Sequence, residues 1–352
     1  MIFDAKHEMI RKLVRQFAET ELTTEVLDKV EETGEFPEEI VDKMAKCGFL
    51  GLKIPREYGG AGADTLAYVI MIEEIARVSA VASLYANTPN SLGGGPLMQA
   101  GTPEQLEKYL RPSVENKVKI VFGLTEPGAG SDVSGLVTTY KRENGKIYLN
   151  GTKTFITSSK GVKYLIIMCR DADNPDVISE FFVDMSKPGI SLSPLTKLGL
   201  RMDSCCEVYL DNVEMEEKDF FGKEGNGFNR GVADFNFERW LVAACDYGTA
   251  ISAFEDAAKH AWARVAFGKP VARFQLNSLK FCHMAIKLDS MRNMLYEAAW
   301  NADTNLGGDV DAGQAAMCKY FCANASFEVV DDAMQVMGGI AVASEHRINR
   351  IW

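Results

Sequence analysis

The sequence lacks a long apolar run, and this argues against a membrane-spanning helix. No stretch reaches the roughly 18 consecutive apolar residues that a span needs. The chain begins M-I-F-D-A-K-H-E, with an acid and no apolar core behind it, so we expect no signal peptide. A cytoplasmic protein without a membrane partner is therefore expected.

Positive charge is also scarce. Lysine and arginine together number 38, against 49 aspartates and glutamates, which gives a formal net charge of -11 at pH 7. Clustered lysines and arginines drive binding to nucleic acid and to anionic membranes, so neither is expected as the main partner. With 352 residues, 47% of them hydrophobic, the chain has enough apolar material for a globular protein of two or three domains.

Cysteine and histidine do not occur in the spacings of a disulfide framework or a metal site. Cys318 and Cys322 share a helix face, yet no histidine or aspartate completes a ligand set there. We expect no metal, and we expect the cysteines to be buried and reduced. Gly128 and Gly130 lack the third glycine of a dinucleotide-binding fingerprint, which argues against a nicotinamide cofactor.

The hydrophobic period changes twice along the chain, which predicts an α+β fold of three domains. Residues 1–117 have helical stripes, residues 118–221 have the period of two typical of strands, and residues 222–352 are helical again. The short strands with turns between them predict a small antiparallel barrel. The long helices that follow predict a four-helix bundle.

Specific elements are expected within these domains. Thr102 and Gln105 form a capping box that opens a helix. The predicted helices are 7–22, 65–85, 104–110, 228–267, 274–305 and 311–337. The predicted strands are 118–124, 136–141, 146–149, 153–156, 164–169, 180–184 and 207–210.

The most informative stretch is V-F-G-L-T-E-P-G-A-G-S-D-V, residues 121–133. A buried strand stops at Thr125, after which Gly128 and Gly130 remove Cβ atoms where the backbone must approach something closely. Thr125 and Ser131 supply hydroxyls, and the turn supplies backbone N–H groups suited to a ring edge or a phosphate oxygen. Taken alone, the stretch is more typical of a glycine turn between two strands.

A second motif, N-G-T-K-T-F-I-T at residues 150–157, follows the first. Together they resemble the paired signature of the acyl-CoA dehydrogenase family of flavoproteins, and the resemblance covers nearly the whole chain. It implies an N-terminal α-helical domain, a middle antiparallel β-barrel domain and a C-terminal four-helix bundle. Residues 197–208 (K-L-G-L-R-M-D-S-C-C-E-V) and 274–300 look most like the enzymes acting on crotonobetainyl-CoA and caffeyl-CoA.

The resemblance implies FAD as cofactor and assigns residues to it. The positions matching the flavin site are Phe122, Leu124, Thr125, Ser131, Phe155 and Thr157. An aromatic ring at Phe155 would pack against the isoalloxazine plane, and the family places the Thr157 hydroxyl at the flavin N5 atom. The competing interpretation is that these aromatics and threonines fill one face of a β domain.

A further set matches the positions that hold the adenosine and pyrophosphate of the flavin bound to the neighbouring subunit. These residues are Arg264, Phe267, Gln275, Gln335, Gly338 and Gly339. A helix ended by Gly268 and Pro270 would explain the glycine but not the arginine or the glutamine. The resemblance therefore implies a homodimer or a homotetramer.

Glu238 is the candidate catalytic base. Its helix neighbours Phe235, Leu241 and Val242 are apolar, so desolvation is expected to raise the pKa of its carboxyl. The alternative is a helical glutamate beside Arg239 on a solvated face. Isovaleryl-CoA and long-chain acyl-CoA dehydrogenases carry their catalytic glutamate at this motif position, whereas most relatives place it near the C-terminus.

The chain stops at Trp352, short of where the family continues with an R-D segment and one more helix. We expect a truncated bundle that lacks its last helix, and a glutamate in that missing tail would weaken the assignment of Glu238. Asn236, Arg239 and Ser131 match positions near the coenzyme A chain. Relatives commonly have aspartate at the position of Asn236.

The function that the resemblance implies is the interconversion of a short or conjugated acyl-CoA and its 2-enoyl-CoA. It proceeds by α-proton and β-hydride transfer, with electrons exchanged with an electron-transfer flavoprotein. The closer resemblance favours reduction of the enoyl-CoA as the physiological direction. The alternatives are a flavin monooxygenase of the same fold and a non-catalytic, DNA-associated superfamily member.

Overall fold

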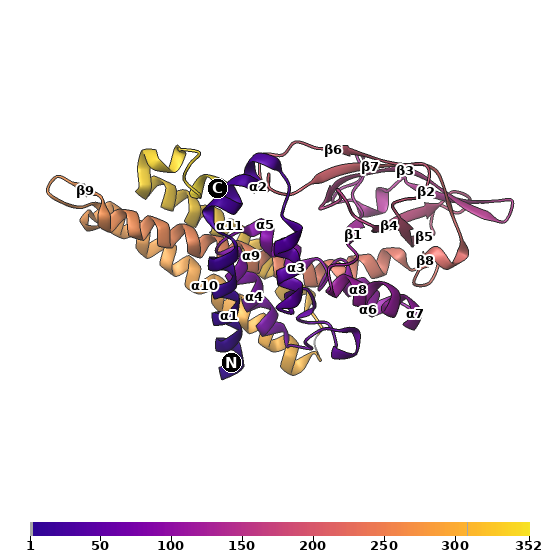
Figure 1. Ribbon diagram of the computed structural model, residues 1–352, viewed down its shortest axis with the longest axis horizontal. Coiled ribbons are helices and arrows are strands. Elements are labelled where there is room, and N and C mark those ends of the chain that lie inside the picture. Colours follow the sequence, from indigo (N-terminus) through magenta and orange to yellow (C-terminus); the bar gives the residue numbers. More distant parts are fainter. Residues whose placement is uncertain (1–2, 308) are drawn as a thin grey trace. The chain divides into compact units, whose positions relative to one another are not determined.

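The computed structural model describes residues 3–307 and 309–352, with only the backbone of Val232 described (Figure 1). These residues form two compact units. Unit 1 comprises the described parts of Met1–Lys29, Ala63–Leu84 and Asn236–Trp352, and unit 2 comprises Val30–Gly62 and Tyr85–Phe235. Three helices, α2, α5 and α9, run across a boundary between the units.

Unit 1 is mainly helical. Its helices, including those shared with unit 2, are α1 (Ala5–Glu21), α2 (Thr24–Thr33), α4 (Thr65–Ala76), α5 (Ala80–Asn87), α9 (Gly227–Ala263), α10 (Gln275–Asn305), α11 (Ala312–Met337) and α12 (Ile348–Ile351). The Asp4 side chain caps α1 by accepting from the backbone N–H groups of Lys6 and His7. Asp311 caps α11 in the same way, and Gly338, with φ +66°, ends it.

The single helix predicted over residues 65–85 is wrong, because the structure has two helices there. α4 ends at Ala76 and α5 starts at Ala80. The hydroxyl of Ser79 accepts a hydrogen bond from the backbone N–H of Ala82 at 3.2 Å. That contact gives a partner to a backbone N–H that would otherwise be unpaired at the start of α5. The short polar side chain of Ser79 thus caps a new helix, although the apolar periodicity of the sequence continues through this position.

The predicted helix 228–267 also ends too late. α9 stops at Ala263, and β9 (Val265–Ala266) pairs with β10 (Lys269–Pro270) in a short hairpin. The turn residues Phe267 and Gly268 have φ of +49° and +77°. Left-handed turn residues and a proline cannot continue a helix, so the hairpin replaces its last turn.

Among its described residues, unit 2 contains an eight-stranded sheet, where the sequence predicted a small antiparallel barrel. Its strands are β1 (Ile120–Gly123), β2 (Thr139–Glu143), β3 (Lys146–Thr157), β4 (Tyr164–Asp171), β5 (Ile178–Asp184), β6 (Ile190–Pro194), β7 (Cys205–Met215) and β8 (Phe220–Phe221). Their order is β6-β7-β3-β2-β4-β5-β8, and β1 pairs with β4. Buried residues on β2 to β5 and β7, including Tyr140, Leu149, Leu165, Phe181 and Val208, form one core cluster.

The sheet differs from the sequence prediction in three respects. It is mixed, because the β1–β4 and β2–β4 pairs are parallel. The strands predicted at 146–149 and 153–156 are one strand, β3, whose register against β7 shifts at two places. Those irregularities interrupt the alternation from which strand length was read. β6 and β8 were not predicted.

Short helices accompany the sheet in unit 2. They are α3 (Glu38–Lys46), α6 (Gly94–Ala100), α7 (Pro103–Gln105) and α8 (Arg111–Val114). The predicted capping box is confirmed, because the Thr102 side chain accepts from the Gln105 N–H and the Gln105 side chain accepts from the Thr102 N–H. The helix predicted at 104–110 changes after α7 to π-type hydrogen bonding over Leu106–Leu110.

The cysteine prediction holds only in part. Cys169, Cys205, Cys206, Cys318 and Cys322 are buried thiols. Cys47 and Cys282 are exposed, so burial was wrongly predicted for these two. Within residues 3–307 and 309–352, no helix combines the length and the apolarity that crossing a membrane would take.

Candidate functional site

The loop that follows β1 is held by a buried ion pair between the two sequence motifs. The Oε1 atom of Glu126 in the first motif lies 2.7 Å from the Nζ atom of Lys153 in the second. Their side chains are 1% and 0% exposed. The Glu126 carboxylate also accepts hydrogen bonds from the backbone N–H groups of Val137 and Thr138. The pair therefore anchors the loop to β3 and to the segment that precedes β2.

Glu126 stays ionised in this setting. Burial by itself raises the pKa of its carboxyl, but the Lys153 ammonium and the hydrogen bonds from Thr138 and Val137 outweigh it and hold the pKa below its usual value. The sequence analysis missed both residues as part of the site. The signal was available, because each motif contributes one charge of opposite sign.

The loop itself is open where the glycines lie. Glu126 and Ala129 exchange two backbone hydrogen bonds and close a tight turn. A Cβ atom placed on Gly128 or Gly130 would have no protein atom within 4 Å. Ser131, at the end of the turn, is exposed. The sequence predicted that something approaches the backbone closely at these glycines. No protein atom does so within the described residues.

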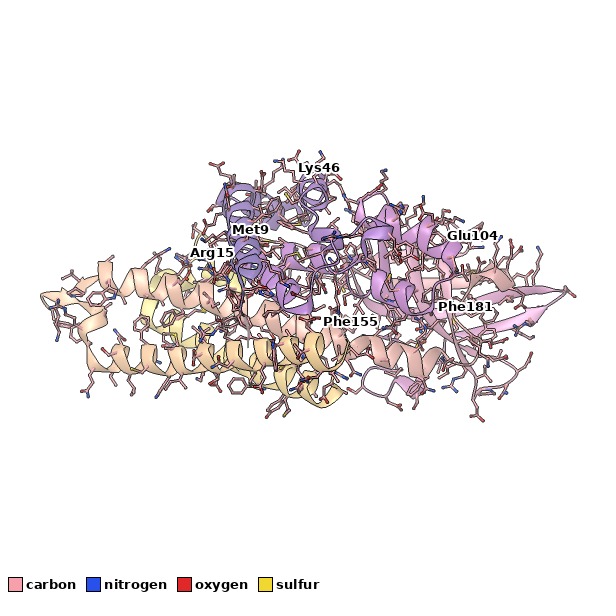
Figure 2. All side chains as sticks on the ribbon, turned by 90° about the horizontal axis from the view of Figure 1, so that it is seen from below. Met9, Arg15, Lys46, Glu104, Phe155 and Phe181 are labelled. Atoms are coloured by element: carbon pink, nitrogen blue, oxygen red, sulfur yellow. The ribbon has the colours of Figure 1, made fainter. Side chains whose placement is uncertain are left out.

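Phe155, labelled in Figure 2, lies in an irregular part of the β3 backbone. It lies where the register between β3 and β7 shifts, its φ is +56°, and its side chain is 65% exposed. Phe181 on β5 shows the contrast, because its ring is fully buried in the core of the same sheet. A non-glycine residue in the left-handed region costs about 1–3 kcal/mol, and such residues cluster at functional sites.

Phe122, Leu124 and Thr125 lie at the end of β1, and all three are partly buried. The backbone carbonyl of Thr125 accepts a hydrogen bond of 2.8 Å from the N–H of Thr154, so the end of β1 lies against β3. The Phe122 ring packs edge-on against Phe235, with 5.7 Å between centroids. The structure thus brings the predicted residues of β1 and β3 together within unit 2.

Thr157 is exposed at the end of β3, and its neighbour Ser158 is tightly held. The Ser158 hydroxyl donates to the Asp203 carboxylate at 2.7 Å, and the Tyr85 hydroxyl donates to the other oxygen at 3.2 Å. Burial raises the pKa of Asp203 although these donors act against it. The sequence analysis did not identify Asp203 as a partner of Ser158 and Tyr85.

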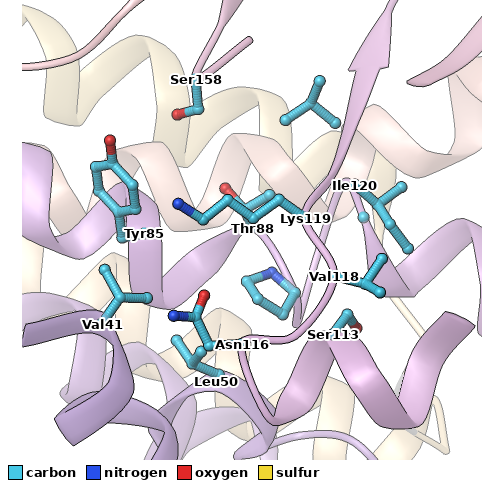
Figure 3. Close-up of a pocket in the computed structure, with 13 residues that line it drawn as sticks. Val41, Leu50, Tyr85, Thr88, Ser113, Asn116, Val118, Lys119, Ile120 and Ser158 are labelled. Carbon is cyan, nitrogen blue, oxygen red and sulfur yellow. The ribbon is translucent and has the colours of Figure 1, made fainter. Parts of the chain in front are cut away.

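A cavity in unit 2 adjoins this end of β3 (Figure 3). Lys119 crosses it, with its ammonium 5.7 Å from the centroid of the Tyr85 ring. Its mainly apolar walls come from α3, α5, β1 and the segments around them, with Val41, Leu50, Tyr85, Val118, Ile120 and Ser158 among the lining residues. The cavity and the candidate residues on β1 and β3 therefore share the same structural elements.

Glu238 lies in unit 1, on α9, and is partly buried. Its nearest described surroundings include Tyr68 of α4, whose pKa is raised by burial and, to a smaller extent, by the Glu238 charge. The Tyr68 ring stacks on Phe237 at 5.8 Å, and Leu241 is 2% exposed. Leu241 of the predicted apolar stripe is thus buried, whereas the apolar setting and the raised pKa of the Glu238 carboxyl stay predictions.

Asn236 and Arg239 lie one turn apart on the same helix. The Arg239 guanidinium donates a hydrogen bond to the side-chain oxygen of Asn236. The amide therefore makes a polar contact with the arginine despite lacking the negative charge that is common at this position.

The remaining predicted residues lie at two helix ends in unit 1. Arg264 and Phe267 belong to the hairpin after α9, where Phe267 is 95% exposed, and Gln275 opens α10. Gln335, Gly338 and Gly339 lie at the end of α11 and are exposed. Lys280 of α10 pairs with Asp332 of α11, so the start of α10 and the end of α11 are neighbours.

Three family models match the chain in sequence. The N-terminal, middle and C-terminal domain models of acyl-CoA dehydrogenase match residues 4–117, 121–213 and 225–352. Together they span all the candidate residues.

Solved structures match over the whole chain. The butyryl-CoA dehydrogenase from Megasphaera elsdenii is 29% identical, with a TM-score of 0.93 over 100% of this chain and 92% of that one. A structure described as the electron transferring flavoprotein of Acidaminococcus fermentans is 30% identical, with a TM-score of 0.93 and the same coverage. A glutaryl-coenzyme A dehydrogenase in complex with glutaryl-CoA is 30% identical, with a TM-score of 0.92 over 100% and 90% of the two chains.

The chain belongs to the acyl-CoA dehydrogenase family. It has that family's fold, with an N-terminal helical domain, a middle β domain and a C-terminal helical domain, and it is an FAD-binding oxidoreductase acting on CH–CH donors. The residues in unit 2 fit this cofactor, because an exposed aromatic face at Phe155 and an open glycine turn provide a ring contact and backbone donors.

Proposed function

We propose that this protein interconverts a short or conjugated acyl-CoA and its 2-enoyl-CoA, and that enoyl-CoA reduction is its physiological direction. The observation that carries the proposal is Glu238, a partly buried carboxylate on α9 beside the buried Tyr68. The similarity to a butyryl-CoA dehydrogenase supports a short acyl chain. The reductive direction rests on the resemblance of residues 197–208 and 274–300 to the crotonobetainyl-CoA and caffeyl-CoA enzymes.

FAD, when bound, supplies the hydride exchange at Cβ of the thioester. We propose that Phe122, Leu124, Thr125, Ser131, Phe155 and Thr157 hold its flavin. The Glu126–Lys153 pair keeps the loop carrying Thr125 in place before the cofactor arrives, because both charges are buried and paired with each other. Such preorganisation lowers the conformational cost of binding.

Glu238 is proposed to handle the proton at Cα. In the oxidative direction its carboxylate removes this proton, and in the reductive direction the protonated group returns it. A carboxyl in an apolar setting suits both roles, because a raised pKa brings donor and acceptor closer together. Arg239 and Asn236 on the same helix, together with Ser131, are proposed to bind the coenzyme A portion.

The proposed catalytic role is tested with Glu238→Gln. We expect turnover of butyryl-CoA or crotonyl-CoA to fall by about 10²- to 10⁴-fold, since a general base typically contributes this factor. The visible flavin spectrum of the variant should stay unchanged. Undiminished turnover would remove Glu238 as the base.

The direction of the reaction is tested by anaerobic stopped-flow. Reduced enzyme is mixed with crotonyl-CoA, caffeyl-CoA or acrylyl-CoA, and flavin absorbance reports reoxidation. We expect reoxidation within turnover time with at least one of the three. No reoxidation by any of them would reject the reductase proposal and leave the dehydrogenase.

Assembly and partners complete the proposal. An electron-transfer flavoprotein is proposed as the redox partner, supported by the similarity to the structure from Acidaminococcus fermentans. Arg264, Phe267, Gln275, Gln335, Gly338 and Gly339 are proposed to bind the FAD of a neighbouring subunit, which requires a homodimer or homotetramer. Phe267, exposed at a hairpin tip, supports this assignment. A cytoplasmic location and the domain limits 1–117, 118–221 and 222–352 are part of the same proposal.

A further inference from the structure

A cluster of three buried charges lies in unit 2, apart from the residues assigned above. Glu180 of β5 is 0% exposed and Asp234 of α9 is 6% exposed. The Arg230 guanidinium, also on α9, forms an ion pair with Glu180, and its Nη1 atom lies 3.8 Å from Asp234 Oδ2. It also stacks over the Phe221 ring, 4.3 Å from the centroid.

The cluster has one acid more than it has bases. Burial raises the pKa of Asp234 to about 6, although the Arg230 charge acts against the rise. The burial of Arg230 likewise lowers the pKa of its guanidinium. Each of the three groups is therefore costly to keep in place unless it has its partners.

The same helix turns approach the sheet very closely. A Cβ atom on Gly227 would lie 2.8 Å from the backbone carbon of Ser179 and 3.0 Å from the Glu180 nitrogen. A Cβ atom on Gly231 would lie 1.8 Å from Met168 Cε and 3.4 Å from Phe122 Cζ. The start of α9 thus touches β5, β4 and β1, and the charges lie beside this contact.

We propose that Glu180, Arg230 and Asp234 fasten the first two turns of α9 to the sheet and thereby act as positioning residues for the proposed acyl-CoA reaction. The next residue, Phe235, packs edge-on against Phe122 of β1. Asn236, Glu238 and Arg239 follow within the same continuous helix. If the start of α9 rotated about the helix axis, these residues would rotate with it, because a hydrogen-bonded helix turns as one body.

Charged groups are suited to this task because a buried charge is stable only beside a partner of opposite sign. Apolar packing of equal volume would stabilise the unit at least as well, since desolvation offsets much of the gain from a buried ion pair. Apolar packing, however, tolerates rotation of the helix by a small angle, whereas an ion pair with a carboxylate on β5 does not. The effect on catalysis rests on the proposed function. The fastening of α9 to the sheet does not.

Two variants test the fastening in the FAD-loaded enzyme. Glu180→Gln removes one partner, and the double variant E180Q/R230M removes both charges while keeping similar volumes. We expect hydrogen exchange of backbone amides 227–235 to quicken by about tenfold or more in both variants. The melting temperature of the double variant should lie above that of Glu180→Gln, because Arg230 is no longer buried without its Glu180 partner, although Asp234 loses the Arg230 charge.

Catalysis provides a second readout. With acyl-CoA deuterated at Cα, the kinetic isotope effect on kcat should increase in both variants, because a misplaced base makes proton transfer more rate-limiting. Glu214→Gln serves as the control, since it breaks an exposed pair with Lys146 in the same unit. That variant should leave both readouts unchanged.

The inference is overturned if exchange of amides 227–235 in the double variant matches that of wild type. It is equally overturned if the double variant restores both the melting temperature and the isotope effect, since the cluster would then only stabilise. A wild type that turns over no acyl-CoA refutes the proposed function instead. The exchange measurement still decides the fastening in that case.

Discussion

At the scale of single residues, the two sequence motifs are joined by the Glu126–Lys153 pair. The motifs were recognised by their glycines and hydroxyls, yet the contact that holds them together is ionic and fully buried. Phe155 completes the arrangement, because its left-handed backbone turns an aromatic side chain outward from a strand. Side-chain charge and backbone strain therefore shape the candidate flavin site as much as the glycines do.

Removing one member of the pair should be costly. In Lys153→Met the Glu126 carboxylate loses its buried partner, and we expect the free energy of unfolding to fall by about 3–5 kcal/mol. Urea denaturation followed by circular dichroism measures this change. The double variant E126Q/K153M should recover most of the loss, because it leaves no uncompensated charge. A single variant as stable as wild type would contradict the structural role given to the pair.

At the scale of elements, α9 carries the proposed base and the proposed coenzyme A contacts Asn236 and Arg239 on a single helix. Its first turns lie close to the sheet of unit 2, and Asn236, Glu238 and Arg239, which follow on the same helix, belong to unit 1. Within unit 1 it also approaches α4 closely. A Cβ atom on Gly248 would lie 2.2 Å from the carbonyl oxygen of Glu73 and 3.1 Å from Ala76 Cβ.

Gly248→Ala should therefore destabilise unit 1. The added methyl group meets the backbone of α4, which cannot rotate away as a side chain can, so we expect a loss of about 1–3 kcal/mol from overpacking. Thermal denaturation reports the change. Gly95→Ala is the matched control, because a Cβ there meets no atom within 4 Å and φ is not in the left-handed region. Equal melting temperatures for the two variants would argue against close α4–α9 packing.

At the scale of the whole molecule, the stability depends on pH through buried carboxyls. Glu73 of α4 is 3% exposed, and the Tyr296 hydroxyl donates a hydrogen bond of 2.5 Å to it. Burial raises the pKa of Glu73 from 4.5 to about 7, although Arg11 and Tyr296 act against the rise. The folded state therefore holds this proton more tightly than the unfolded chain does.

The sign of the effect follows from that difference. The contribution of Glu73 to stability is fully present below pH 4.5 and is lost as pH rises through about 7. Glu73→Gln keeps the hydrogen-bond acceptor but cannot ionise. Between pH 5 and pH 8 we expect wild type to lose up to about 3 kcal/mol relative to this variant, at about 1.4 kcal/mol for each pKa unit. Parallel pH curves for the two proteins would contradict a raised pKa.

The sequence by itself determined the family and the three-part fold, and it supplied the candidate residues of the flavin site. Periodicity and motifs are local, so a strand ending in T-E-P-G-A-G-S-D can be read without knowing what surrounds it. The limits of the helices could not be predicted from the apolar periodicity alone. The Ser79 hydroxyl caps a new helix and Phe267 adopts a left-handed turn, although the apolar stripe continues through both positions.

Only the tertiary structure decided which charges are buried and which partners they have. Glu126 with Lys153, Asp203 with Ser158, and Arg230 with Glu180 are each separated by more than 25 residues along the chain. Burial and pairing depend on distances between elements, and those distances arise only when the sheet and helices pack. For the same reason the sequence named Glu238 as a base, whereas the supports of its helix became visible only in the folded chain.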